Sequence, residues 1–453
     1  VEAGMLILTG SNSYAAGTTV SGGTLEVSAG GSQGGSPSAL GTGAVSIAAG
    51  GRVAYWLSLS GADTITNAFS LSGGTLHTTD GANTYAGQVT LASGTSTISA
   101  QYEDTITLSG GLSGSGNVLF TQSGGTGSYN APTYVLSGTG ANTGTVRVDG
   151  TSNGSPTKLQ LANVNALQGA TLDLATADVG VVEFTVAGTN TYALGGLQGS
   201  RNLALGANSL SVGGNNQNTT YSGGLSGSGS VTKAGSGTLR LTGSNNTSGG
   251  TTVSAGTLQV DGSIAGPLAV TAAGTLSGIG SVGGNATIAG THSPGNSPGI
   301  QTFGGDLTYS AGAVVNWELI ANSTGSAGTD FDQIAVGGNL SFAGSTTLAL
   351  SFDSIGSNVV WADPFWNVNR AWMVYDLSSG SAGSLSNLVV GGSLLDSLGN
   401  SLSPTERGFF TATLVGQDVM LQFTAVPEPS TWAVCLVAAA GGGRMVRRRA
   451  SRS

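Results

Sequence analysis

The chain has 453 residues, of which 79 are glycine and only 8% are charged. Its low charge and plentiful β-branched residues argue against a disordered chain. Its net charge of −9 argues against a nucleic-acid partner, because phosphate binding needs a basic face. The single cysteine, Cys435, excludes a disulfide framework within one chain.

No run of about 20 apolar residues occurs in residues 1–425, so no ordinary transmembrane helix is expected there. The composition favours an all-β protein with short strands and many glycine turns.

Two long segments of the chain repeat each other. Gly4–Val27 reads GMLILTGSNSYAAGTTVSGGTLEV and Gly237–Val260 reads GTLRLTGSNNTSGGTTVSAGTLQV, with 16 of 24 positions identical. Self-similarity at a period of about 20–50 residues is typical of solenoids and arrays.

The chain begins without Met and shows no secretory signal peptide. We therefore expect an export signal N-terminal to the printed sequence.

Short strands of the form apolar-x-apolar recur between the glycine turns. Examples are Leu25–Val27, Leu239–Leu241 and Leu258–Val260, each with a polar residue in the middle. Side chains alternate faces along a strand, so Leu241 and Leu258 should face a core while Arg240 and Gln259 face water. Residues 1–305 are predicted to form a right-handed parallel β-helix, with roughly 12–15 coils of about 20–25 residues. A β-sandwich or an irregular array of hairpins remains the alternative.

The two long segments resemble the autotransporter-associated β-strand repeat, also called the passenger-associated transport repeat. Its unit reads roughly G-x-L-x-L-T-G-x-N-x-Y-x-G-x-T-x-V-x-x-G-T-L-x-V; Tyr14 fills the aromatic position and Thr247 departs from it. Residues 292–299, HSPGNSPG, resemble the turn that closes the repeat region in similar proteins. Only about 125 residues then precede the tail, too few for a translocator barrel of a dozen strands. Self-transport through a C-terminal barrel is therefore not expected.

Residues 306–425 are predicted to form a β-rich cap. A solenoid end exposes unpaired edges and apolar core, so something must cover it. Three of the six tryptophans, Trp361, Trp366 and Trp372, lie close together here and suit that role. A second interpretation makes them, with Phe365, a platform on which sugar rings stack.

Residues 426–453 have three parts in a fixed order. A short motif, Val426, Pro427, Glu428 and Pro429, precedes an apolar stretch and a basic terminus. The apolar stretch begins Trp432, Ala433, Val434, Cys435, Leu436, Val437, and the basic residues are Arg444, Arg447, Arg448 and Arg449. As a helix, the apolar stretch would be about 20 Å long, shorter than the hydrocarbon core of a bilayer. We expect a short C-terminal transmembrane helix with its arginines in the cytoplasm.

This order resembles the PEP-CTERM sorting signal of exported bacterial proteins. The resemblance implies recognition by a membrane-embedded exosortase, cleavage near Pro427–Pro429, and only transient contact with the inner membrane. It also implies delivery to the cell surface or extracellular matrix. The alternative is a permanent single-span anchor.

Residues that could carry chemistry are few. The two histidines, His77 and His292, have no zinc-type spacing, and His292 is expected in a surface loop. The best carboxylate pairs, Glu103 with Asp104 and Asp330 with Asp332, have no neighbouring Lys or Arg and are expected on a solvated surface. Calcium binding and catalysis are the less favoured alternatives at these pairs.

The sequence therefore predicts no catalytic residue, metal or cofactor. We expect a non-enzymatic, exported structural or adhesive protein of the cell surface or matrix. Its expected partners are an exosortase-type enzyme and an extracellular polysaccharide or other matrix component. The alternative function is a β-helix that binds or degrades extracellular polysaccharide.

Overall fold

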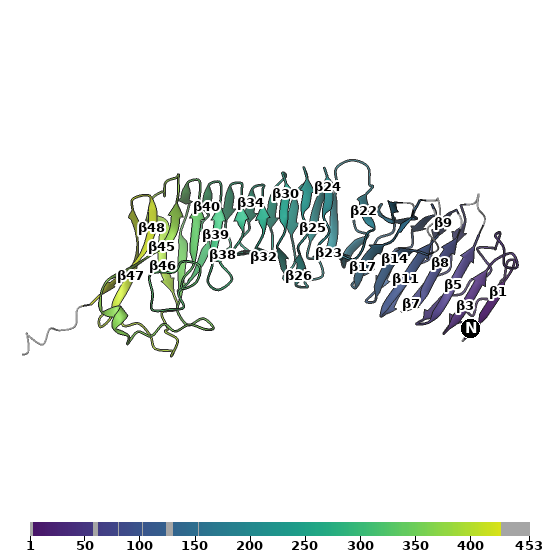
Figure 1. Ribbon diagram of the computed structural model, residues 1–453, viewed down its shortest axis with the longest axis horizontal. Coiled ribbons are helices and arrows are strands. Elements are labelled where there is room, and N and C mark those ends of the chain that lie inside the picture. Colours follow the sequence, from purple (N-terminus) through teal and green to yellow (C-terminus); the bar gives the residue numbers. More distant parts are fainter. Residues whose placement is uncertain are drawn as a thin grey trace, which may run out of the picture.

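The computed structural model describes residues 3–57, 62–79, 81–101, 103–123, 130–152 and 154–426. These residues form an elongated, gently curved β-rod that runs from β1 (Met5–Leu8) at one end to β48 (Asp418–Ala425) at the other (Figure 1). The described part of the chain contains no α-helix, and its two helical turns are the 3-10 segments η1 (Pro364–Asn367) and η2 (Leu385–Asn387).

Three faces of parallel strands make up the rod. Within the described residues, the first face has seventeen strands, each hydrogen-bonded to the next along the rod. They are β1, β3 (Gly23–Val27), β5 (Gly51–Trp56), β8 (Thr75–Thr79), β11 (Thr95–Ala100), β14 (Asn117–Gln122), β17 (Thr145–Asp149), β21 (Leu167–Leu174), β23 (Thr191–Gly199), β26 (Thr219–Tyr221), β29 (Thr238–Leu241), β32 (Gly256–Val260), β35 (Gly274–Gly278), β38 (Thr291–Pro294), β41 (Val314–Glu318), β44 (Thr346–Ser351) and β46 (Leu388–Gly392).

The second face is built from shorter strands. They are β2 (Thr18–Val20), β4 (Val45–Ala48), β7 (Phe69–Ser72), β10 (Val89–Ser93), β13 (Leu112–Gly114), β16 (Ala141–Asn142), β25 (Ser209–Val212), β28 (Val231–Lys233), β31 (Thr251–Val253), β34 (Leu268–Val270), β37 (Ala286–Ile288), β40 (Leu307–Tyr309) and β43 (Leu340–Phe342). The long strand β23 pairs through its first half with β25 and through Gly199 with β26, so it belongs to both faces.

The third face completes each coil. It contains β6 (Thr64–Ile65), β9 (Ala82–Tyr85), β12 (Thr105–Leu108), β15 (Thr133–Leu136), β20 (Lys158–Leu161), β22 (Val181–Phe184), β24 (Leu203–Gly206), β27 (Leu225–Gly227), β30 (Ser244–Thr247), β33 (Ser263–Ile264), β36 (Ser281–Val282), β39 (Ile300–Phe303), β42 (Gln333–Val336), β45 (Arg370–Leu377), β48 and β47 (Gly408–Val415). A small antiparallel pair, β18 (Thr151–Ser152) and β19 (Ser155–Pro156), projects from one coil.

The stacking confirms the predicted solenoid, and its handedness stays a prediction. Fourteen described strands of the first face, β1 to β38, lie within residues 1–305, inside the expected range of coils. Coil length varies more than predicted. The coil that leads from Thr24 to its paired residue Arg52 is much longer than the coil that leads from Thr275 to its paired residue Thr291.

The core lies inside the three faces and follows the alternation read from the sequence. Leu241 and Leu258 are fully buried, whereas Arg240 and Gln259 are partly exposed on the outer side of the same strands. Rings also stack between coils, as in the edge-to-face contacts of Tyr55, Phe69 and Tyr85 at centroid distances of 5.5–6.5 Å. One apolar column therefore runs along the rod.

The predicted boundary at residue 305 is not a break in the stacking. Parallel pairing continues from β38 to β41, from β41 to β44 and from β44 to β46. The change comes later, where β48 pairs antiparallel with both β45 and β47 and ends the third face. Stacking can continue because residues 306–392 keep supplying apolar-x-apolar strands such as Leu340–Phe342.

The C-terminal tail falls almost entirely outside the described residues. Val426 follows β48, and its N–H donates to Arg407 O at 3.0 Å. Pro427, Glu428 and Pro429, the apolar stretch from Trp432 and the terminal arginines all lie beyond it. Among the residues that the structure describes, no helix is long and apolar enough to cross a membrane.

Candidate functional site

The site with the most developed geometry is a cleft on the outer side of the first face, beside the turn formed by residues 294–299. Its volume is about 440 Å³. It is lined by Gln259, Ser277, Ser293, Pro294, Gly295, Asn296, Ser297, Asn316, Trp317, Glu318, Asp332 and Ser351. We call this space the 294–299 cleft.

The floor of the cleft is a row of polar side chains at matched positions on neighbouring strands. Gln259 is in register with Ser277, and Ser277 with Ser293. Asn316 Nδ2, on the next strand, donates to Ser293 Oγ at 2.9 Å. Each of these residues stands between two buried neighbours on its strand and so faces outward, and the row runs across the strands at their spacing of about 4.8 Å.

The 294–299 turn is held against the first face at several points. The backbones of Gly278 and Gly295 exchange two hydrogen bonds, at 2.9 and 3.2 Å. Gln259 Nε2 donates to Asn296 Oδ1 at 2.9 Å, and Asn296 Nδ2 donates to Asp261 Oδ1 at 3.2 Å. Gly295 has φ +90°, and a Cβ there would lie 2.3 Å from Gly299 N. This position therefore needs glycine.

Two carboxylates hold the far end of the turn. Ser297 Oγ donates to Glu318 Oε2 at 2.7 Å, and the Gly299 N–H donates to Asp332 Oδ1 at 2.8 Å. Asp332 Oδ2 also accepts from the Glu318 N–H at 3.1 Å. Burial raises the pKa of the Asp332 carboxyl to about 8, although these two N–H groups favour its charged form. Asp332 therefore ties the turn to β41 from inside the protein.

The expectation that Asp332 is solvated on the surface is wrong, because the side chain is 2% exposed. Asp104 is also buried, at 4% exposure. Asp330 and Glu103 remain partly or fully exposed. Each pair therefore has one carboxylate in the interior and one outside it. The closeness of the two residues in the sequence does not show which of them is buried.

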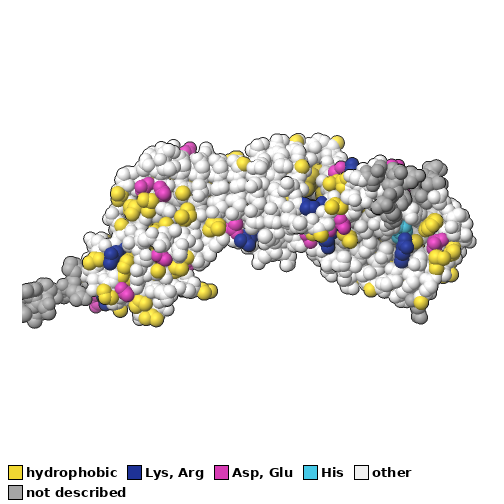
Figure 2. All heavy atoms as spheres, viewed as in Figure 1, with side chains coloured by type: hydrophobic (Ala, Val, Ile, Leu, Met, Phe, Trp, Pro, Cys, Tyr) yellow, Lys and Arg dark blue, Asp and Glu magenta, His cyan; other side chains and the backbone are white. Residues whose placement is uncertain are grey.

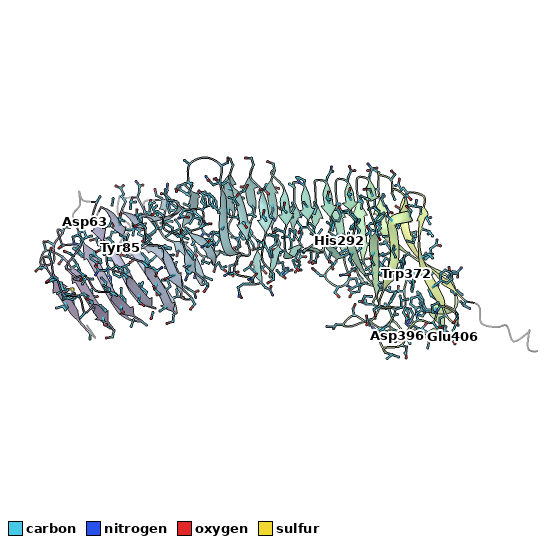
Figure 3. The ribbon with its side chains drawn as sticks, turned by 180° about the vertical axis from the view of Figure 1, so that it is seen from behind. Asp63, Tyr85, His292, Trp372, Asp396 and Glu406 are labelled. Carbon is cyan, nitrogen blue, oxygen red and sulfur yellow. The ribbon has the colours of Figure 1, made fainter. Side chains whose placement is uncertain are left out.

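His292 also differs from expectation: it is a core residue of β38 rather than part of a surface loop (Figure 3). Gln301 Nε2 donates to Ser277 O at 3.1 Å, which leaves Gln301 Oε1 to accept from His292 Nε2 at 2.7 Å. His292 Nδ1 then accepts from the Tyr309 hydroxyl at 2.6 Å. Burial lowers the pKa of His292 to about 4, so the ring is neutral at pH 7.

His77 lies on the first face, far along the rod from His292. It is 1% exposed, and its Nδ1 contacts Ser99 Oγ at 2.9 Å and Ser123 Oγ at 3.0 Å. Burial, followed by the positive charge of Arg52, lowers the pKa of His77 to about 3. A ring so weakly basic is a poor general base for either serine.

The three tryptophans proposed as a sugar platform are interior residues. Trp361, Trp366 and Trp372 are between 0% and 3% exposed, and each indole N–H donates to a protein oxygen at 2.7–3.0 Å. They pack with one another and with Phe410 at the C-terminal end, where Figure 3 shows Trp372. Their rings are not available for stacking on a sugar, and they fill the end of the rod instead.

Among the residues that the structure describes, no group of three or more His, Cys, Asp and Glu side chains could hold a metal ion. The cleft residues Asn316 and Glu318 were not predicted from the sequence. The only local signal for them is their outward position on a strand that follows the Pro-Gly turn. That signal is shared by many strands of the rod.

The repeat is supported by comparison with known families. Residues 2–27 and 231–260 match the passenger-associated-transport-repeat family. Both segments close one coil of the same length, because Met5 pairs with Thr24 in the first and Thr238 pairs with Thr257 in the second. This match supports the repeat read from the sequence and suggests an exported surface or extracellular protein. No curated protein matches the chain.

Proposed function

We propose that this protein is a structural and adhesive component of a bacterial cell surface or extracellular matrix, and that it acts without catalysis. The observation that carries the proposal is the continuous first face, whose strands pair in sequence from β1 to β46. Each coil is supported by its neighbours through backbone hydrogen bonds and one apolar column, which gives a stiff rod.

The surface of the rod also suits this function. In Figure 2 the charged side chains appear as scattered spots on a surface that is mostly polar and uncharged. Three ion pairs are formed by described residues: Arg147 with Asp178, Lys158 with Glu183, and Arg240 with Asp261. A surface with few charges and many hydroxyl and amide groups can form hydrogen bonds with a neutral partner along its length.

Sorting is the second part of the proposal. Strand β48 ends at Ala425, and the Val426-Pro427-Glu428-Pro429 motif follows directly. Cleavage by an exosortase-type enzyme at the motif would release the rod with its last strand intact. Proline disfavours helix, so the motif can stay extended and accessible beside a membrane-inserted segment.

The test is fractionation of cells that carry the native gene, with mass spectrometry of the surface and membrane fractions. The expected result is a surface protein that lacks peptides from Trp432 onward. Replacement of Pro427, Glu428 and Pro429 by alanine should leave the full-length chain in the membrane. Recovery of Trp432–Arg444 from surface protein would refute sorting by cleavage, and a cytosolic native protein would refute the proposed function as a whole.

A further inference from the structure

We propose that the 294–299 cleft is a binding site for a neutral glycan chain, which lies along the row formed by Gln259, Ser277, Ser293 and Asn316. The inference rests on the proposed extracellular function, since it names the kind of matrix component that the rod would hold. The proposed glycan-binding surface is this polar row, which is open to solvent, and not the tryptophans, which are buried.

The size of the cleft fits such a ligand. Its volume of about 440 Å³ falls in the range of roughly 300–1,000 Å³ typical of ligand sites. Asn296 and Ser297 are exposed at its rim and Asn316 is exposed at one end of its floor, while Gly295 and Asp332 are buried beneath it. A chain can therefore enter from the side and extend beyond the cleft along the rod.

The chemistry of the lining favours uncharged hydroxyl groups. Serine hydroxyls and the Asn and Gln amides can both donate and accept hydrogen bonds, as sugar hydroxyls do. The residues that line the cleft include no Lys or Arg, and they include Glu318, which repels an anionic chain. A uronic acid polymer would thus meet a carboxylate without a compensating cation.

The spacing of the floor suits a repeating ligand. Gln259, Ser277 and Ser293 lie at matched positions of consecutive strands, and Asn316 bonds to Ser293 from the next strand. The strand spacing of about 4.8 Å places a polar side chain at a regular interval along the rod. A glycan running in this direction meets similar groups at successive sugar units.

The wall of the cleft is set before any ligand arrives. Hydrogen bonds from Gln259, Ser297 and Gly299 hold the 294–299 turn to two different coils, that of β32 and that of β41 and β42. A wall that is already ordered loses little conformational entropy on binding, which favours affinity. The buried carboxyl of Asp332 is thus a positioning group for the turn, with no direct role in contacting the glycan.

The test is affinity electrophoresis of the purified full-length protein in gels that contain dextran, hydroxyethyl cellulose, glycol chitin or polygalacturonate. The expected result is retardation by at least one of the three uncharged polymers and none by polygalacturonate. Ser293→Tyr, which fills the cleft, should weaken that retardation at least tenfold. Asn316→Ala, at an exposed position, should weaken it several-fold without filling space.

Thr232→Tyr is the matched control, since Thr232 is an outward residue of β28 on the second face. It should be retarded like the wild type, and circular dichroism should show that all variants fold alike. Retardation by none of the uncharged polymers, preference for polygalacturonate, or wild-type binding by both cleft variants would overturn the proposal. Surface localisation is measured separately, so a surface protein that binds no glycan would refute this inference alone.

Discussion

The two histidines should stay uncharged far below the pH at which free imidazole ionises. His292 is fully buried, with both ring nitrogens hydrogen-bonded to Tyr309 and Gln301. Burial lowers its pKa to about 4. Burial and the nearby Arg52 lower the pKa of His77 to about 3. In the unfolded chain both rings have a pKa of about 6.5.

The sign of the effect on stability follows from proton binding. Between pH 6.5 and the folded pKa, the unfolded chain binds more protons than the folded one, so acid favours unfolding. The stabilising contribution is complete above about pH 6.5 and is lost as the pH falls toward about 4 for His292 and about 3 for His77. At about 1.4 kcal/mol per pKa unit, the free energy lost is roughly 3 kcal/mol for His292 and roughly 5 kcal/mol for His77.

The assay is NMR of the imidazole carbon-bound protons during an acid titration. The chain has two histidines, so one substitution, His292→Gln, assigns both signals. Neither signal should titrate between about pH 5 and pH 8. Urea unfolding should also show a smaller loss of stability on acidification for His292→Gln than for the wild type. A signal that titrates with a pKa of about 6.5 would show that its ring is solvated and would refute the reasoning.

Three further substitutions test the packing and the turn. Leu258→Ala should lower the free energy of unfolding by about 2–5 kcal/mol, whereas Arg240→Ala, which removes a 44% exposed arginine and leaves Asp261 bonded to Gln259 and Asn296, should cost about 1 kcal/mol or less. Urea denaturation measures both, and equal losses would contradict the alternation. Gly295→Ala should loosen the 294–299 turn and speed its cleavage by a protease. Gly312→Ala is its control, because Gly312 also has positive φ but a Cβ there meets nothing within 4 Å. Equal protease sensitivity of the two glycine variants would contradict the role of close packing at Gly295.

The sequence alone determined which way the strand residues face and that the chain repeats. Leu258 and Gln259 alternate because successive side chains of any strand point to opposite sides, so a short stretch of strand carries the information. The passenger-associated transport repeat was visible for the same reason, since its turns and strands are contiguous in the chain. These are local properties, and the stacked coils repeat them.

Only the tertiary structure decided which polar groups lie inside and where a site forms. Asp332 meets Gly299, and Gln259 meets Asn296, although each pair is far apart in the sequence. Such contacts depend on how many residues each coil takes, and this number is not constant along the rod. His292 was expected in a loop because of the Pro-Gly residues after it. It is buried because β38 stays in register with Leu276 of β35, and that register brings Tyr309 and Gln301 to the ring.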